Sequence, residues 1–455
     1  MSLDIDKDVQ VGAIVTAQSM AKKDLLSDDD GLEYREKIYA MITEDDPDLR
    51  SAAASFIHEV YIECDLQPEY DKLNKKSGKS VPKRDVYMLK GIVELLNVVA
   101  AQCDDMHHII ESLLQECDFL NEVGMMCDVM MEEEGEDCLD DEQKTTLGRM
   151  IWGVVATLSE NAEPDESGQR LGKKKNPAVE KCRQTTLVLG EKLPNMLRYF
   201  SANPTALIAL VGTLEHIMLD AFNAKDSSSK QIAEALIDIT KKGVDEDLLM
   251  SCAIALEHFS GSTYAARPTV EALVKNLFKS LATDLKKVAE AFEKKAKLTT
   301  VHTYTLTRLV VLSGRCDVFK SEQSIRTDAV KMLAAIADED SSIPPEIACQ
   351  AILLVSQYLG WSVLTPASDD RVNETKEQLV GCCHALFDRS DLEPHLRAQA
   401  NAALADCQQL FGRNAQEVLP SCCPFAFLSN MWTCAAAEFA PACCDAIRSD
   451  LRMWK

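Results

Sequence analysis

The sequence of 455 residues predicts an all-α protein, a solenoid in which antiparallel helix pairs stack into a bent superhelix. Three observations predict this fold class. Apolar residues make up 46% but aromatics only 6%, and the mixture of Leu, Ala, Met, Glu and Lys favours helices. Alternating β-branched runs and hairpin dipeptides such as Asn-Gly are scarce. The connections between helical segments are short, which makes consecutive helices antiparallel neighbours.

One helix is marked clearly by the segment DPDLRSAAASFI at residues 46–57. Pro47 suits the first position of a helix, and Asp46 before it can cap the free N–H groups. An apolar stripe at helical spacing follows, formed by Leu49, Ala53, Phe56 and Val60. The alanines in this stretch allow a neighbouring helix to approach closely, as stacked helix pairs require.

The same pattern recurs elsewhere in the chain. DKDVQVGA at residues 6–13 precedes DPDLRSAA at 46–53 by 40 residues, and EPHLRAQA at 393–400 is a third copy. A spacing of 40 residues lies within the period of about 40–47 residues of HEAT arrays. The segment 32–43 supplies a partner helix, so residues 46–57 are interpreted as the inner helix of a HEAT hairpin.

Further helices complete the array, which is expected to span residues 1–412. We predict an interruption at Gly124 in one of them, and Asn203 and Pro204 as the cap and first residue of another. The predicted helices lie at 82–102, 106–132, 139–161, 177–200, 204–222, 228–242, 245–260, 268–297, 299–313, 324–338, 344–364, 369–389 and 392–412.

Charge is distributed unevenly along the chain. The net charge is −25, and residues 104–142 hold 15 acidic residues with no Lys or Arg. This segment is interpreted as a solvated face that aids solubility, or alternatively as a docking surface for a basic peptide. The protein as a whole is not expected to bind polyanions generally.

Two segments are basic, and both contain residues typical of loops. Residues 72–84 hold six basic residues and no acidic one, and residues 168–177 hold four basic residues. They are flexible solvated loops, a nuclear localisation signal, or arms that neutralise DNA phosphates without reading bases. The predicted phosphate contacts are Lys72, Lys75, Lys76, Lys79, Lys83, Arg84, Lys173, Lys174 and Lys175.

Motifs that carry catalysis are absent from the sequence. It contains no Gly-rich phosphate loop, no G-x-S-x-G and no H-E-x-x-H. His107 and His108 are adjacent, so on a helix they point about 100° apart. Cys382, Cys383 and His384 lack the C-x-x-C spacing of a zinc site. We therefore predict no enzyme, no metal, no cofactor and no small-molecule substrate.

The cysteines and the apolar runs predict an intracellular protein. Most of the 17 cysteines stand singly in helical patterns, which indicates reduced, buried thiols. No apolar signal segment follows Met1, and no apolar run reaches the roughly 18–20 residues of a membrane span, so no membrane partner is expected. Residues 413–455 change composition abruptly and are interpreted as an atypical tail, such as intron read-through.

An ordered set of segments resembles the stromalin (stromal antigen) family of cohesin subunits. The segments include HIIESLLQECDFLNEVGMMCDVMMEE, LVLGEKLPNMLRYFSANPTALIALVGTLEHI and PPEIACQAILLVSQYLGW, in family order over residues 1–412. The resemblance implies an armadillo-like helical, non-catalytic regulatory subunit in the nucleus, on chromatin. It also implies roles in sister chromatid cohesion, chromosome organisation, chromosome segregation and the cell cycle. Its implied partners are the kleisin, through it the ring ATPase subunits, and double-stranded DNA without sequence preference.

The resemblance also implies one partner-binding residue. QANAALADCQQLF resembles a family helix in which an acidic residue contacts the kleisin, and Asp406 occupies that position. We expect this carboxylate to be free to meet a kleisin Lys or Arg, or else to be a solvated helix carboxylate. The expected packing side consists of Ala402, Ala403, Ala405 and Leu410. Met1 falls inside the family's repeat array, so a fragment without the amino-terminal region and its aromatic-peptide pocket is expected.

Two other classes of protein fit an acidic HEAT array. A nuclear transport receptor would bind basic cargo along an inner surface, and the two basic segments argue against it. A phosphatase-type or other protein-interaction scaffold would have more regular repeats.

Overall fold

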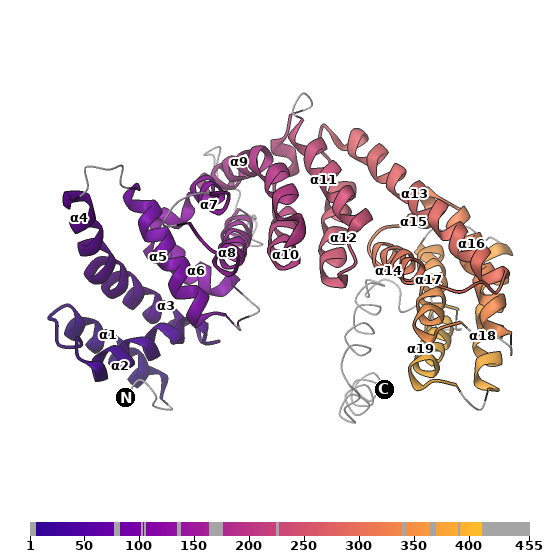
Figure 1. The fold of residues 1–455 in the computed structure, drawn as a ribbon, viewed down its shortest axis with the longest axis horizontal. Helices are drawn as coiled ribbons and strands as arrows, with labels where there is room; N and C mark the ends of the chain where they lie inside the picture. Colours follow the sequence, from indigo (N-terminus) through magenta and orange to yellow (C-terminus); the bar gives the residue numbers. More distant parts are fainter. Residues whose placement is uncertain are drawn as a thin grey trace. The chain divides into compact units, whose positions relative to one another are not determined.

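The structure is a computed structural model. It describes residues 6–76, 82–101, 103, 106–133, 138–162, 176–223, 227–338, 343–364, 370–389 and 392–411. All regular secondary structure in these residues is helical (Figure 1). The prediction of an all-α HEAT-repeat solenoid is confirmed.

The chain forms two compact units, each built from helix pairs. Unit 1 comprises Met1–Ile239 and His258–Val270, and unit 2 comprises Thr240–Glu257 and Glu271–Lys455. The helices α11 (Ser228–Lys242), α12 (Glu246–Gly261) and α13 (Arg267–Glu293) therefore contribute residues to both units.

Unit 1 is organised in two rows of helices. In one row α1, α3, α6, α8 and α10 pack successively, and in the other α5, α7 and α9 do so. The elements of unit 1 are α1 (Lys7–Ala21), α2 (Asp29–Ala40), η1 (Met41–Thr43), α3 (Pro47–Phe56), η2 (Ile57–Leu66), α4 (Gln67–Lys76), α5 (Arg84–Val99), α6 (His107–Glu116), η3 (Asp118–Asn121), α7 (Val123–Met130), α8 (Asp141–Glu160), α9 (Pro177–Tyr199), η4 (Phe200–Ala202), α10 (Pro204–Gly212), η5 (Thr213–Glu215) and η6 (Leu219–Ala221).

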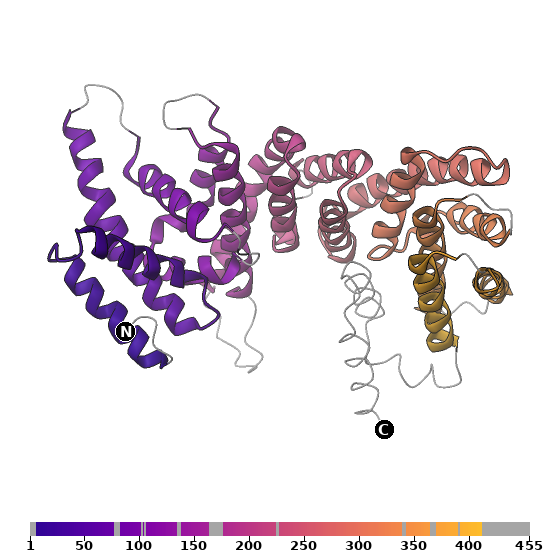
Figure 2. The same cartoon turned by 60° about the horizontal axis from the view of Figure 1, so that its bottom comes forward.

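Unit 2 repeats this two-row arrangement. The row α14, α17 and α19 packs against the row α16 and α18, the orange to yellow helices of Figure 2. Their bounds are α14 (Thr300–Ser313), α15 (Val318–Ser321), α16 (Ser324–Ala337), α17 (Pro345–Leu364), α18 (Asp370–Phe387) and α19 (Pro394–Phe411). The four-residue α15 is a helix that the sequence pattern did not predict.

The predicted start of α3 is confirmed in its details. The carboxylate of Asp46 accepts hydrogen bonds from the backbone N–H groups of Asp48 (2.9 Å) and Leu49 (3.2 Å), and Pro47 is the first residue of the helix. The apolar stripe is buried, as expected. The helix continues beyond Phe56 through η2, a π-helix of 10 residues, and into α4 without a break.

Two predicted helix boundaries are wrong. The helix expected at 106–132 breaks at residues 117–122, where Cys117 has non-helical backbone angles (φ −118°, ψ 84°), and not at Gly124. Gly124 lies inside α7, where a Cβ atom would stand 3.4 Å from Val188 of α9. That distance is an ordinary van der Waals contact, so α7 runs through Gly124 and a larger residue would also fit there. The helix expected at 204–222 ends at Gly212 and is followed by single 3₁₀ turns.

The core helix of unit 2 corrects another expectation. α17 is 20 residues long and apolar enough to cross a membrane by length and composition, whereas the sequence was expected to hold no such run. It packs against α14, α16, α18 and α19, and 61% of its most apolar window is buried. A helix covered on several sides has to be apolar nearly all round, so burial in the protein explains its composition.

Most of the cysteines in the described residues are buried, as expected. Burial raises the pKa of Cys252 and of Cys316 to about 12. These thiols are therefore protonated at neutral pH and pack as small apolar side chains.

Candidate nucleic-acid and partner interfaces

Most of the described residues of the first basic segment are helical, whereas a loop was expected. Lys72 and Lys75 lie in the last turns of α4, where their side chains are exposed, and Lys76 is the last residue of that helix. Lysine favours helices, which explains why α4 includes Lys72, Lys75 and Lys76. The helix ends at Lys76, before Ser77 and Gly78 in the sequence, and both residues disfavour a helix. Lys79 lies outside the described residues.

The far side of the segment starts α5. Lys83 precedes the helix and is exposed, whereas Arg84 is its first residue and is half-buried. The guanidinium of Arg84 forms ion pairs with Glu63 (3.1 Å) and Asp85 (3.6 Å), and its Nε donates to the side chain of Gln67. Nearby carboxylates therefore compensate the charge of Arg84. The exposed cations described at this end of α4 and α5 are Lys72, Lys75 and Lys83.

Aromatic contacts hold the two helices together at this point. The rings of Tyr70 on α4 and Tyr87 on α5 have centroids 5.6 Å apart. The hydroxyl of Tyr87 donates to Glu69 (3.4 Å). These contacts bring the lysines of α4 to the same end of the helix pair as Lys83.

The predicted DNA contacts of the second basic segment cannot be located in the structure. Lys173, Lys174 and Lys175 lie outside the described residues. The two residues that end this segment belong to the start of α9, because the side chain of Asn176 accepts from the backbone N–H of Ala178 (3.0 Å) and Pro177 is the first helical residue.

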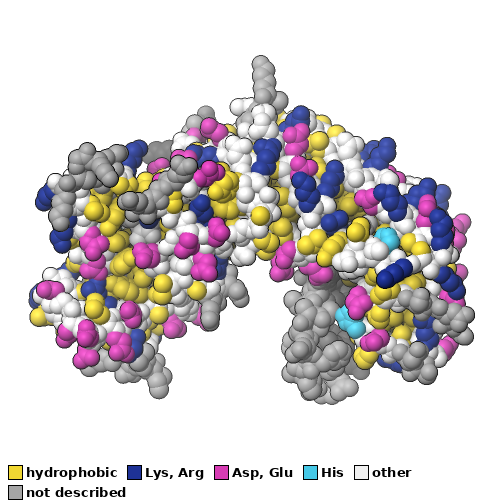
Figure 3. Space-filling view, viewed as in Figure 1, with side chains coloured by type: hydrophobic (Ala, Val, Ile, Leu, Met, Phe, Trp, Pro, Cys, Tyr) yellow, Lys and Arg dark blue, Asp and Glu magenta, His cyan; other side chains and the backbone are white. Residues whose placement is uncertain are grey.

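A further basic surface was missed at the level of sequence. Lys275, Lys279 and Lys286 of α13 are exposed, and their spacing of four and seven residues places them on one helix face. Within the described residues, none of the three has an ion pair. Lys and Arg side chains gather over α11 and α13 in Figure 3. The spacing was visible in the sequence, but the three lysines are separated by mostly uncharged residues and form no run.

The end of α11 is basic as well. Lys241 and Lys242 are exposed in its last turn. Arg308 of α14 donates to the backbone carbonyl of Gly243 (2.9 Å) and is also attracted by Asp284 of α13. α14 therefore links the end of α11 to α13 within unit 2.

Asp406 is buried, contrary to expectation. Its side chain lies in α19 and is 5% exposed, and neither carboxylate oxygen has a hydrogen-bond partner among the residues that the structure describes. Burial raises the pKa of Asp406 to about 6. The carboxylate is therefore neither free in solvent nor neutralised within the described part of the chain.

The expected packing side of α19 is partly wrong. Ala403 is buried as expected, but Ala405 is exposed, and Ala402 and Leu410 are half-buried. The buried residues of this helix are Leu396, Ala400, Ala403, Asp406 and Cys407. Their spacing forms one helical stripe against α17 and α18, and Asp406 falls within it.

No metal centre can be assembled from the described residues. Among them, no group of three or more His, Cys, Asp and Glu side chains lies close enough to hold a metal ion. His107 and His108 face different carboxylates, at 3.3 Å from Glu160 and 3.6 Å from Glu111. Cys382 and Cys383 are buried in α18.

Comparison with known proteins identifies one family. The family model for the HEAT-repeats domain of cohesin subunit SCC3/SA matches residues 108–361, more than half of the chain. No curated protein matches the sequence.

Solved structures resemble the fold only loosely. A chain from the structure of Kap95p bound to RanGDP has 12% identity and a TM-score of 0.40, covering 93% of this chain and 54% of that chain. Importin beta in an ammonium sulfate condition has 14% identity and a TM-score of 0.38, covering 91% of this chain and 53% of that chain. This chain thus spans about half the length of those two chains. An engineered protein has 13% identity and a TM-score of 0.29, covering 63% of this chain and 99% of that chain.

Proposed function

Because the chain belongs to the family of cohesin SCC3/SA subunits, we propose that it is a non-catalytic regulatory subunit of cohesin that binds the kleisin and double-stranded DNA. Through the kleisin it would join the ring ATPase subunits on chromatin in the nucleus and act in sister chromatid cohesion and chromosome organisation. The observation that carries this proposal is the family match over residues 108–361. The transport-receptor alternative has only loose likenesses of fold in its favour.

Two lysine-bearing surfaces support contact with DNA. The net charge of −25 repels a polyanion over most of the molecule, so phosphate contacts have to be local. The α4–α5 end offers Lys72, Lys75 and Lys83, and α13 offers a lysine face without ion pairs in the described residues. Lysine side chains neutralise phosphates as point charges and read no base sequence, so the proposed binding is non-specific.

The remaining predicted DNA contacts are retained on sequence grounds. Lys76 and Lys79 add positive charge next to Lys72, Lys75 and Lys83 in the sequence, and Lys173, Lys174 and Lys175 form a separate basic cluster. Arg84 is proposed to contribute less than the lysines, because phosphate would compete with Glu63 and Asp85 for its guanidinium.

The salt dependence of DNA binding tests this part of the proposal. Replacing Lys72, Lys75 and Lys83 with Ala should lower the slope of log K against log salt by about 0.9 for each lost phosphate contact. The matched control removes three lysines of unit 1 that are ion-paired at 2.6 Å, namely Lys7, Lys22 and Lys37. If the two triple variants had equal slopes, the salt dependence of DNA binding would reflect the net charge of the chain, and the proposed contacts of Lys72, Lys75 and Lys83 would be overturned.

Asp406 is the proposed kleisin contact, for a reason that differs from the sequence argument. An unpaired buried carboxylate is costly, and a Lys or Arg of the kleisin that reached it would form an ion pair shielded from water. A long, thin cationic side chain suits a carboxylate that is only 5% exposed. The proposed contact is thus a buried charge pair and not a surface one.

Co-expression with the cohesin kleisin tests the function as a whole. The two chains should co-purify as a stable complex in size-exclusion chromatography at physiological salt. Failure of the folded, monomeric chain to retain the kleisin would overturn the proposal, irrespective of its DNA binding.

A further inference from the structure

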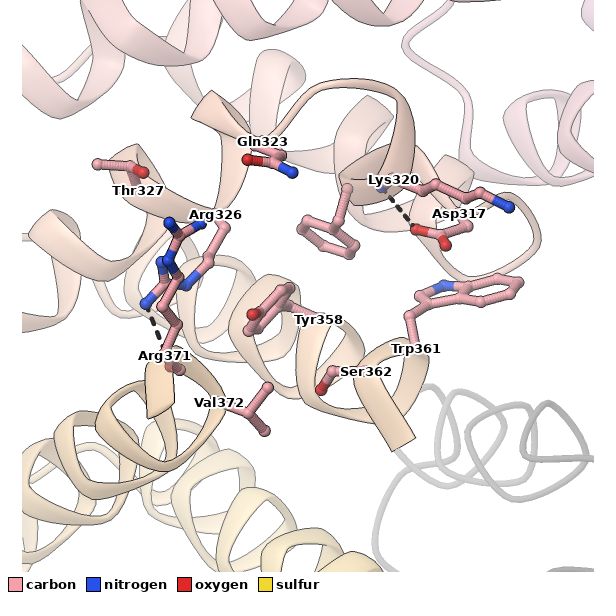
Figure 4. A pocket seen from close by; sticks show the side chains of 11 residues that line it. Asp317, Lys320, Gln323, Arg326, Thr327, Tyr358, Trp361, Ser362, Arg371 and Val372 are labelled. Atoms are coloured by element: carbon pink, nitrogen blue, oxygen red, sulfur yellow. Dashed lines mark hydrogen bonds between the residues drawn. The ribbon is translucent and has the colours of Figure 1, made fainter. Parts of the chain in front are cut away.

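A cavity in unit 2 lies apart from the residues assigned above. It has a volume of about 260 Å³ and opens between α15, α16, the second half of α17 and the start of α18 (Figure 4). Its lining consists of Asp317, Phe319, Lys320, Gln323, Arg326, Thr327, Tyr358, Trp361, Ser362, Arg371 and Val372. The lining combines three aromatic rings with three cationic side chains, an unusual mixture for the wall between packed helices.

The aromatic part of the cavity is held rigidly. Phe319 is buried and meets the ring of Tyr358 edge-on, with centroids 5.3 Å apart. The indole Nε1 of Trp361 donates to the backbone carbonyl of Ser313 at 2.6 Å, which fixes the ring orientation. Tyr358 and Trp361 remain half-buried, so part of each side chain is accessible from the opening. A fixed aromatic surface binds an incoming ring with little loss of conformational entropy.

The cationic part flanks the rings on two sides. In Figure 4, Arg326 and Arg371 lie on one side of Tyr358, and Lys320 lies on the other. Lys320 and Arg371 are exposed, whereas Arg326 is half-buried. These positions allow two separate anionic groups to be met at once.

Arg326 positions this part of the wall. Its Nε donates to the hydroxyl of Thr375 (3.0 Å), and its Nη2 donates to the carbonyl of Arg371 (3.1 Å). Its guanidinium also lies 5.6 Å from the centroid of Tyr358. Arg326 therefore ties the start of α18 to α16 and α17, and Arg371 and Lys320 are the cations presented to a ligand.

The charge balance of the lining favours an anionic ligand. Asp317 is the one carboxylate that lines the cavity, and its Oδ1 accepts from the backbone N–H of Lys320 at 2.9 Å, where it caps α15. Arg326 is also ion-paired with Glu374 at 3.6 Å, so the positive charge that a ligand could meet comes from the exposed Lys320 and Arg371. The same cations disfavour a methylated lysine, the usual ligand of an aromatic cage.

We propose that this cavity binds a linear peptide segment of a partner protein in which an aromatic side chain is flanked by Asp or Glu. The ring would pack against Tyr358 and Trp361, and the carboxylates would meet Lys320 and Arg371. A volume of about 260 Å³ lies just below the roughly 300–1,000 Å³ typical of small-molecule sites, so it accommodates one or two side chains. The proposal is independent of the proposed cohesin function.

A labelled peptide tests the proposal with the full chain. The probe is a fluorescein-labelled peptide of sequence Gly-Asp-Glu-Phe-Asp-Glu-Gly, followed by fluorescence anisotropy. Trp361→Ala and Arg371→Glu should each weaken its binding about tenfold or more, as expected for central contacts. The matched control is Lys275→Glu on α13, which makes the same change of net charge as Arg371→Glu outside the cavity and should leave the affinity unchanged.

Two comparisons distinguish the proposed ligand from other anions. A peptide with Phe replaced by Ala should bind at least about tenfold more weakly, and a single-stranded oligonucleotide should not displace the probe. Equal binding of the Phe and Ala peptides would reduce the site to simple charge attraction and overturn the proposal. The proposal would also be overturned if the oligonucleotide displaced the probe from the wild type but not from Arg371→Glu. The same holds if the probe did not bind at concentrations up to about 1 mM.

Discussion

Two helices of unit 2 each bury an aspartate, with opposite outcomes. Asp328 of α16 and Asp406 of α19 are both 5% exposed. Asp328 has the ammonium of Lys331 at 3.0 Å, one helical turn away, and this hydrogen bond raises the pKa of Lys331. Within the described residues, neither oxygen of Asp406 has a hydrogen-bond partner, and burial raises the pKa of Asp406 to about 6.

This difference separates a structural carboxylate from a candidate site. A buried carboxylate that is paired locally contributes to packing and leaves little free energy for a ligand to gain. An unpaired one keeps its full desolvation cost, which a partner cation can offset. Burial alone therefore does not mark a site, whereas burial without a partner does.

The largest expected effect concerns kleisin binding. Asp406→Asn should weaken kleisin binding by about 2–4 kcal/mol, because removing one member of a buried charge pair leaves the other unpaired. Isothermal titration with the purified kleisin measures this loss. Asp406→Lys is less informative, because a longer cation placed on the buried stripe of α19 also disturbs packing against α17 and α18.

Two control variants accompany that measurement. Asp328→Asn removes the other buried aspartate, and Glu377→Gln removes an exposed carboxylate of the neighbouring helix α18. Both should keep the wild-type affinity for the kleisin. An equal loss in Asp328→Asn would mean that the kleisin responds to the stability of unit 2 and not to Asp406.

In the absence of the kleisin, Asp406→Asn should stabilise the chain. Asp406→Asn is expected to raise the free energy of unfolding at pH 7.5 by about 1–2 kcal/mol, since it removes an unpaired charge but leaves a buried amide. Urea unfolding followed by circular dichroism measures the gain. A lower stability of Asp406→Asn would indicate that the carboxylate is paired in solution.

The pH dependence of stability should identify Asp406 directly. Its pKa of about 6 in the folded chain exceeds the roughly 3.9 of an unfolded aspartate, so the folded state binds the proton more tightly. The destabilisation by Asp406 is therefore complete above about pH 6 and fades as the pH falls from 6 towards 4. The stability advantage of Asp406→Asn should shrink over that window, which parallel melting curves at pH 7.5 and pH 4.5 would detect.

The smallest expected effect is at the paired aspartate. Asp328→Asn should lower the free energy of unfolding by about 0.5–1 kcal/mol at pH 7.5, because Lys331 is 47% exposed and solvent screens the pair. High salt should reduce the difference between Asp328→Asn and the wild type. Thermal unfolding at two salt concentrations measures this, and a loss that salt leaves unchanged would assign Asp328 a packing role instead.

Local signals in the sequence were sufficient for the fold class and for many helix starts. The cap and first residue of α3, of α9 and of α10 follow from Asp-Pro or Asn-Pro pairs, because capping involves only residues within one turn. The resemblance of an ordered set of segments to the stromalin family is likewise confirmed by the family match over residues 108–361. These properties depend on the chain alone.

The tertiary structure decided what each charged residue does. Whether Asp406 faces solvent depends on how much of the α19 surface is covered by α17 and α18. Arg84 forms an ion pair with Glu63, which lies 21 positions earlier in the chain. The cavity between α15 and α18 collects its rings and cations from four helices. Helical periodicity fixes which residues of one helix share a face, but the partner of a buried charge is set by helices that meet only when the chain folds.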